Sequence, residues 1–331
     1  MTIPPLSLLD LALIGRGQTP ADALAASVTL ARRAEALGIT RIWYAEHHNM
    51  SSIASSAPAV LIAHVAAHTT TIRLGAGGVM LPNHSPLSIA EQYGTLATLH
   101  PGRIELGLGR APGSDQATMR AMRRDHTSSD TFPDDVLEVK GYLDGASRVP
   151  GVSAVPGAGT RVPLYILGSS LFGASLAAHL GMPFAFASHF APDALRDAVA
   201  LYRSRFQPSA ELAEPHAFAA VNVICDDTDD AAHDQYRRAL RWRAQRFLSL
   251  PESMSDDELD QVLASPQGQQ IARMTTYSAV GSPGTVADYL ERFAEHADAD
   301  ELVVALSSPT GDERLRSLEL VAGIAARCVA A

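Results

Sequence analysis

Short apolar runs alternate with amphipathic segments along the chain. Eight runs have the length and nearly continuous apolar character of buried parallel strands. They are residues 6–14, 41–48, 73–81, 103–110, 162–170, 183–190, 216–227 and 301–309. Most segments between them have helical periodicity, as in 19–39, where Thr19 is placed to cap a helix and Pro20 to occupy its first turn. The alternation predicts an α/β fold with a parallel sheet.

Eight β/α units in 331 residues fit a (β/α)8 TIM barrel, and a doubly wound open sheet is the competing arrangement. An open sheet usually carries a nucleotide-binding glycine fingerprint in its first β-turn-α unit, and this chain has none there. Two stretches depart from the alternation: about 111–159 is polar and weakly patterned apart from a helix near 133–143, and about 251–279 is acidic and poor in core residues. We therefore predict one barrel domain, 1–331, with insertions after strands four and seven that are long enough to cover the mouth as lids.

Composition excludes several classes of protein. The chain is 47% hydrophobic with a net charge of −10 and no basic run, so nucleic acid and membranes are poor partners. No apolar run reaches the roughly 18–20 residues that span a bilayer. The N-terminus lacks the basic region of a signal peptide, and Cys225 and Cys328 lack metal or disulfide spacing. These features predict a cytoplasmic protein with ordinary thiols.

The block 73–113 carries the most candidate chemistry. Gly77-Gly78 lies inside the third strand, where two glycines weaken the strand unless unusual geometry or a close approach needs them. Arg110 ends the fourth strand, at the edge where parallel α/β folds bind ligands, and its guanidinium suits a phosphate. A salt-bridged arginine at the rim is the competing interpretation. GLGRAPG (107–113) is only a weak dinucleotide fingerprint, because its last glycine is out of register.

Ser169 and Ser170 follow the fifth strand, where the next helix begins. Their hydroxyls and the free N–H groups of the helix terminus either bind an anion such as phosphate or only cap the helix. Strands four and five are neighbours in the predicted barrel, so one anion can bridge Arg110 and the two serines.

Glu46-His47-His48 ends the second strand. Successive side chains point to opposite faces, so only one histidine can face the mouth. That histidine either acts as a general acid or base or hydrogen-bonds a loop. A metal site is a further alternative, with candidate ligands at His47, His48, His64, His68, His84 and His189. His64 and His68 have i,i+4 spacing without an adjacent glutamate, so we predict no metal.

Taken together, four motifs resemble the bacterial luciferase-like flavin-dependent monooxygenases. They are YAEHHN (44–49), the run from GGVMLPNHS to GLGRAPG (77–113), LGSSLFGASLAAHLGMPFAFASHF (167–190) and GSPGTVADYLERFAEHADADELVV (281–304). The resemblance covers most of the chain outside the two insertions. It implies a TIM barrel that binds reduced FMN at its C-terminal mouth.

The resemblance also implies roles for single residues. Arg110, Ser169 and Ser170 match the phosphate contacts, although family members often have glutamate at the first serine position. Gly77-Gly78 matches a non-prolyl cis peptide beside the flavin ring. His47 matches the histidine of the active centre. The resemblance places three more residues at the mouth: His48, Asn83 and His84.

The implied reaction is a monooxygenation. Reduced FMN and oxygen form a C4a-peroxide that oxidises a small organic substrate such as an aldehyde or ketone. The chain has no nicotinamide motif, so a separate flavin reductase is the expected source of reduced FMN, and the resemblance suggests a homodimer. A deazaflavin-dependent oxidoreductase is the alternative enzyme. A flavin-binding protein without turnover is the non-catalytic alternative, and the histidine at position 47 argues against it.

Overall fold

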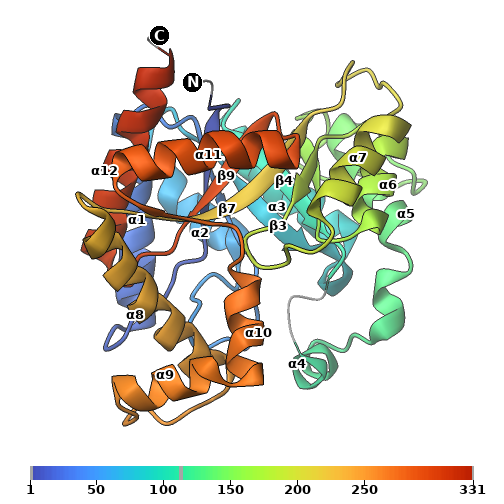
Figure 1. The fold of residues 1–331 in the computed structure, drawn as a ribbon. Helices are drawn as coiled ribbons and strands as arrows, with labels where there is room; N and C mark the ends of the chain where they lie inside the picture. Colours follow the sequence, from blue (N-terminus) through green and yellow to red (C-terminus); the bar gives the residue numbers. More distant parts are fainter. Residues whose placement is uncertain (1–2, 112–114, 330–331) are drawn as a thin grey trace.

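Parallel strands form a closed barrel at the centre of the protein (Figure 1). The computed structural model describes residues 3–111 and 115–329. The barrel strands are β1 (Leu6–Asp10), β2 (Arg41–Tyr44), β3 (Arg73–Met80), β4 (Ile104–Gly109), β5 (Leu164–Gly168), β6 (Phe184–Phe186), β7 (Ala217–Cys225) and β9 (Glu301–Leu306). They pair in this order, and β9 returns to β1. The predicted (β/α)8 TIM barrel is confirmed.

Helices cover the outside of the barrel (Figure 1). They include α1 (Pro20–Ala36), α2 (Pro58–Ala66), α3 (Pro86–Leu99), α5 (Phe132–Asp144), α6 (Leu171–Leu180), α7 (Leu195–Arg205), α11 (Pro283–Ala297) and α12 (Gly311–Val329). A further helix, α8 (Asp229–Phe247), extends toward the end of the barrel opposite the chain termini (Figure 1). Thr19 caps α1 as predicted: its hydroxyl accepts from the Asp22 N–H, and the Asp22 carboxylate accepts from the Thr19 N–H. In the described residues, no helix is both long and apolar enough to cross a membrane.

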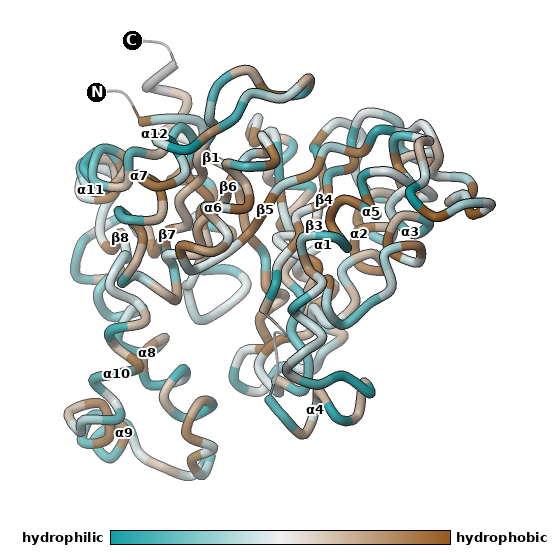
Figure 2. The backbone as a smooth tube through the Cα atoms, turned by 90° about the vertical axis from the view of Figure 1, so that its right-hand side faces the viewer, coloured by the Kyte–Doolittle hydropathy of each residue, from teal (hydrophilic) through white to brown (hydrophobic). Residues whose placement is uncertain are grey.

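The two stretches predicted as insertions project in part from one end of the barrel. The first contains α4 (Gln116–Ala121) and a 3-10 helix (His126–Ser129), and the second contains α9 (Asp256–Ala264) and α10 (Pro266–Met274). In Figures 1 and 2, α4 and the α9–α10 pair both lie beyond the barrel, at the end opposite the chain termini. The rest of 111–159 is not a projection, because α5 packs against α3 in the outer layer.

One strand was missed by the sequence pattern. β8 (Ser278–Gly281) pairs in parallel with the last four residues of β7 and is not one of the strands that close the barrel. The first strand is also shorter than predicted. It ends at Asp10, whose carboxylate accepts the Ala12 N–H at 2.8 Å, and Ala12 takes a φ of 49°. Residues 11–14 therefore leave the sheet and pass over the mouth.

The glycine pair of β3 lies where strands approach very closely. The peptide bond between Gly77 and Gly78 is cis. A Cβ added at Gly77 would lie 2.8 Å from the Cβ of Trp43, and one at Gly78 would lie 2.8 Å from the carbonyl oxygen of Gly107. No side chain fits at either position, which accounts for two glycines inside a buried strand.

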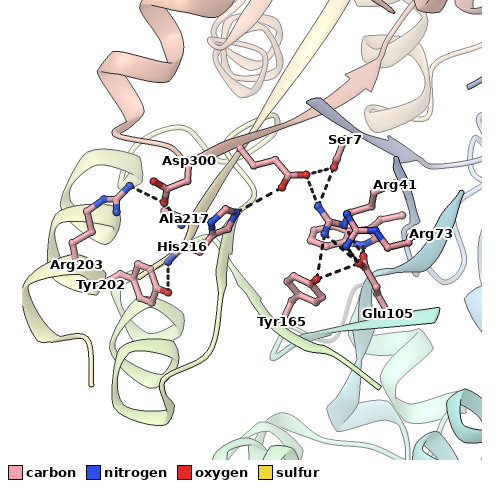
Figure 3. A network of polar contacts seen from close by, with 12 residues as sticks. Ser7, Arg41, Arg73, Glu105, Tyr165, Tyr202, Arg203, His216, Ala217 and Asp300 are labelled. Atoms are coloured by element: carbon pink, nitrogen blue, oxygen red, sulfur yellow. Dashed lines mark hydrogen bonds and ion pairs between the residues drawn. The ribbon is translucent and has the colours of Figure 1, made fainter. Parts of the chain in front are cut away.

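An ion-pair network is buried at the N-terminal end of the barrel (Figure 3). Arg41, at the start of β2, pairs with Glu105 of β4 (Nε to Oε2, 2.6 Å) and with Glu301 of β9. The Ser7 hydroxyl donates to Glu301, and the Trp43 indole N–H donates to Glu105 at 2.9 Å. Burial alone would lower the pKa of Arg41, but the hydrogen bond and charges of its carboxylate partners raise it above its usual value.

Candidate active site

A cavity of about 340 Å³ lies at the C-terminal end of the barrel. Its wall is built from residues that follow β1, β2, β6 and β9 and from α8. Most of the wall is apolar, including Leu13, Met50, Ile53, Phe190, Leu240 and Trp242. Ligand sites of TIM barrels lie at this end, because the loops that follow the strands converge there.

His47, the predicted catalytic residue, lines this cavity. Its backbone N–H donates to the Ser55 carbonyl at 3.0 Å, which fixes the chain just after β2. The neighbouring Glu46 is fully buried and accepts hydrogen bonds from His48 Nε2 at 2.7 Å and from His84 Nε2 at 2.8 Å. β2 ends at Tyr44, so Glu46-His47-His48 follows the strand and does not end it as predicted. One of the two histidines nevertheless lines the cavity while the other binds a buried carboxylate.

The charges around Glu46 stabilise its ionised form. Burial alone would raise the pKa of Glu46, but hydrogen bonds from His48, His84 and the Met80 N–H lower it below its usual value. The hydrogen bond to Glu46 raises the pKa of His48. The cluster ties the end of β2 to the end of β3, so it holds the backbone that carries His47.

The three residues predicted at the mouth do not line the cavity. His48 and His84 bind Glu46, as described above. The carbonyl oxygen of Asn83 accepts a hydrogen bond from Arg124 Nη2 at 3.3 Å. They act on the shape of the mouth through these contacts.

Arg110 and the serine pair lie at the ends of adjacent strands. β4 pairs with β5 up to Gly109 and Leu167, so Arg110 and Ser169-Ser170 extend from neighbouring positions. The Arg110 guanidinium lies 4.1 Å above the Phe172 ring and, among residues 3–111 and 115–329, has no carboxylate partner. The described residues thus give no support to the alternative of a salt-bridged rim arginine. Pro112 and Gly113, the rest of the GLGRAPG motif, lie outside the described residues.

Ser170 occupies the N-cap position of α6 without making a side-chain capping bond. Ser169, Ser170 and Phe172 are all exposed. The hydroxyls and the first N–H groups of α6 are thus available to a ligand, beside an exposed guanidinium. This corner therefore has the hydrogen-bond donors of an anion site.

Several residues of the cavity were missed as site residues by the sequence reasoning. Asn222 of β7 donates to the His189 carbonyl at 2.7 Å and accepts from the Ser307 hydroxyl at 3.0 Å, which ties β7 to the loops that follow β6 and β9. A polar residue inside an apolar strand was the available signal for Asn222. His189 was considered only as a metal ligand, and Arg243 gave no signal, because α8 is rich in arginine.

His64 is on the exposed face of α2 and His68 lies just beyond the end of this helix, with the two ring centroids 4.7 Å apart. Cys225 is a buried free thiol whose pKa burial raises to about 12. Neither feature lies in the cavity wall.

Comparison with known proteins identifies the family. The family model described as luciferase-like monooxygenase matches residues 7–300. A protein of Escherichia coli strain K12 named luciferase-like monooxygenase is 48% identical over 95% of both chains. An N-acetyl-S-alkylcysteine monooxygenase of Bacillus subtilis is 39% identical over 71% of this chain and 72% of its own. The crystal structure of apo-MsnO8 superposes with a TM-score of 0.87 at 35% identity, over 97% of each chain. The chain belongs to the luciferase-like monooxygenase family, so the resemblance seen in its motifs is confirmed.

Proposed function

We propose that this protein is a flavin-dependent monooxygenase that uses reduced FMN and oxygen to oxidise a small organic molecule. The observation that carries the proposal is the order of features around the mouth. The neighbouring strands β2, β3, β4 and β5 lead in turn to His47, the cis peptide Gly77-Gly78, Arg110 and the pair Ser169-Ser170. One ligand with a phosphate at one end and a ring at the other can contact this whole row.

The residues at the end of β4 and β5 fit the phosphate of FMN. Arg110 offers a guanidinium that no described carboxylate neutralises, and Ser169, Ser170 and the start of α6 offer further donors. A planar guanidinium with converging N–H and O–H groups matches the geometry of phosphate oxygens. In this arrangement the cis peptide of β3 borders the flavin ring.

The cavity beside His47 is the proposed place of substrate oxidation. Bound reduced flavin supplies the electrons that activate oxygen. The apolar wall excludes water from the reacting groups. His47 holds or transfers a proton at the substrate, the role that suits a histidine near neutral pH. A separate reductase supplies reduced FMN in this proposal, and a homodimer is its expected assembly.

A deazaflavin-dependent oxidoreductase is the competing proposal. Two solved structures with the same fold illustrate both possibilities: a Baeyer–Villiger monooxygenase in complex with FMN (18% identity, TM-score 0.70) and an F420-dependent secondary alcohol dehydrogenase (17% identity, TM-score 0.72). At these identities the likeness concerns the fold alone. The name of the 39% identical relative, an N-acetyl-S-alkylcysteine monooxygenase, favours oxygen chemistry.

Anaerobic titration separates these alternatives. Reduced FMN is expected to bind at least about tenfold more tightly than reduced F420, and riboflavin more weakly than FMN, followed by flavin fluorescence or calorimetry. With oxygen, a flavin reductase and a panel of thioethers, ketones and aldehydes, one product should carry oxygen-18 from labelled oxygen gas. Tighter binding of F420 than of FMN would replace the proposal by its competitor. Flavin binding with no labelled product across the panel would favour a binding protein.

The phosphate role of Arg110 gives a sharper test. Arg110→Ala should weaken FMN binding about 10- to 100-fold, because it removes charge-assisted hydrogen bonds to the phosphate. Riboflavin has the same ring without the phosphate, so its affinity should change less than about twofold. The measurement is a parallel titration of wild type and variant with both ligands. Equal weakening of FMN and riboflavin would show that Arg110 does not contact the phosphate.

A further inference from the structure

The cavity at the mouth is basic although the protein is acidic. Its wall includes Arg243, Arg246 and Arg314 together with two histidines, and among the described residues no aspartate or glutamate lines it. The whole chain, by contrast, carries a net charge of −10. Arg246 is paired with Glu252 at 2.9 Å, so the attraction of the wall for a negatively charged ligand depends on the arginines that have no such partner.

Arg243 differs from the other arginines of α8. Arg237, Arg238, Arg241 and Arg246 each form an ion pair with an aspartate or glutamate, at 2.6 to 3.3 Å. Within the part of the chain that the structure describes, the Arg243 guanidinium has no ion pair and no hydrogen bond, and it lines the cavity. Burial lowers the pKa of Arg243, yet an arginine stays charged at neutral pH. A partly buried cation without a counter-ion is unfavourable, so binding an anion beside it is favourable.

His189 provides a second polar group close to Arg243. Its ring lines the same cavity, and its Nδ1 is buried without a partner among the described residues. Burial, with the positive charges of Arg243 and His47, lowers the pKa of His189 to about 3. The ring is neutral at physiological pH, so it can donate one N–H to an anion without a charge of its own.

The remainder of the wall suits an apolar body. Trp242 lies beside Arg243 on α8 and stacks under the Arg246 guanidinium at 4.0 Å. Leu240 and Phe190 also line the cavity. A ligand that satisfies Arg243 and also fills this space has one acidic group and a hydrocarbon or aromatic part.

We propose that this cavity binds an organic carboxylate, whose acid group pairs with Arg243 and accepts a hydrogen bond from His189. Its apolar body lies against the wall formed by Leu240, Trp242 and Phe190. The inference rests on the proposed function, because it names the substrate class of the same site. Arg243 is the residue that selects acids over neutral molecules of equal size.

Three probes of equal chain length test this inference: octanoate, 1-octanol and octylamine. Their binding to the flavin-free protein is followed by calorimetry and by the fluorescence of Trp242. Octanoate should bind at least about tenfold more tightly than octanol, and octylamine more weakly than both. Arg243→Met should weaken octanoate about 10- to 100-fold and octanol less than about twofold. Arg243→Lys should retain part of the preference for octanoate.

Arg237→Met is the matched control, because Arg237 lies on the same helix, is exposed and pairs with Asp234. It should leave all three affinities unchanged. The inference is overturned if octanoate does not bind at millimolar concentration, if octanol binds as tightly, or if Arg243→Met keeps the preference. If Arg243→Met does not fold, the order of the three affinities measured on wild type decides whether the inference holds.

The same variants are titrated with FMN, so failure of the two proposals can be told apart. If Arg243→Met binds FMN as tightly as wild type but no longer binds octanoate, the result supports Arg243 as the residue that anchors the substrate. Loss of FMN binding comparable to that in Arg110→Ala would assign Arg243 to the flavin and overturn the inference. Selective octanoate binding by a protein that binds no flavin would keep the carboxylate site and refute the proposed cofactor.

Discussion

Replacing Arg41 with methionine should destabilise the protein by about 3–5 kcal/mol at neutral pH. Arg41 is buried at the N-terminal end of the barrel, where it pairs with both Glu105 and Glu301 (Figure 3). Methionine has a similar length, so the variant loses the charge more than the volume. Two buried carboxylates then remain with less compensation, and this uncompensated charge, more than the lost attraction, sets the size of the effect.

The destabilisation caused by Arg41→Met should become smaller as the pH falls. In wild type, burial alone would raise the pKa of Glu301, but His216, Arg41 and Ser7 hold it below its usual value, so this carboxylate stabilises the fold at neutral pH and loses that contribution in acid. In the variant the charge of Arg41 is gone while burial remains, so the folded-state pKa of the same carboxyl should be higher than in wild type. Protonation of this carboxyl then costs the variant less stability than it costs the wild type. Urea unfolding at pH 7 and pH 5 should show a smaller difference between the two proteins at pH 5.

A surface ion pair provides the control for Arg41. Arg33 pairs with Glu319 at 2.6 Å, but both side chains are well exposed. Arg33→Met should cost less than about 1 kcal/mol, because solvent screens the pair. Adding Glu105→Gln to Arg41→Met should restore part of the stability by removing one unpaired charge. An Arg41→Met protein as stable as Arg33→Met would contradict the assigned role of the network.

The barrel could be predicted because its strands are buried on both faces. Such strands are continuous apolar runs, and the sequence from Ala217 to Cys225 is a clear example. Helix starts could be predicted as well, since Thr19 caps α1 and Pro20 lies in its first turn, as expected from the sequence. β8 was missed because it has only four residues, Ser278–Gly281, and pairs on one side only. Nothing in so short a segment distinguishes a strand from a loop.

The candidate site was predictable where it depends on strand ends. His47 and Arg110 follow β2 and β4, and any barrel places such residues at its mouth. Arg243 was not predictable, because its sequence context, RRALRWRAQR, indicates an exposed basic face. Its distinction appears only in the fold: the other four arginines of α8 pair with carboxylates, and this one faces a cavity. The buried role of Glu46 depends likewise on His84, which approaches it only in the fold.

Replacing His47 with alanine should lower turnover by about 10²–10⁴-fold while leaving FMN affinity within about twofold of wild type. His47 lines the cavity, whereas the proposed phosphate contacts lie at the ends of β4 and β5. Loss of the imidazole therefore removes the proton-transferring group without touching the group that anchors the flavin. Turnover is measured with reduced FMN, oxygen and an organic molecule that wild type oxidises, and FMN affinity by titration of the same preparations.

Two further variants separate a chemical role of His47 from a structural one. His47→Gln keeps a hydrogen-bonding side chain of similar size but cannot transfer a proton near neutral pH, so it should be nearly as inactive as alanine. His179→Ala, on the exposed face of α6, should change neither turnover nor affinity. Recovery of activity in His47→Gln would mean that the residue only holds the cavity in shape. Parallel loss of FMN binding and turnover in His47→Ala would likewise refute proton transfer, because it would place His47 in the flavin site itself.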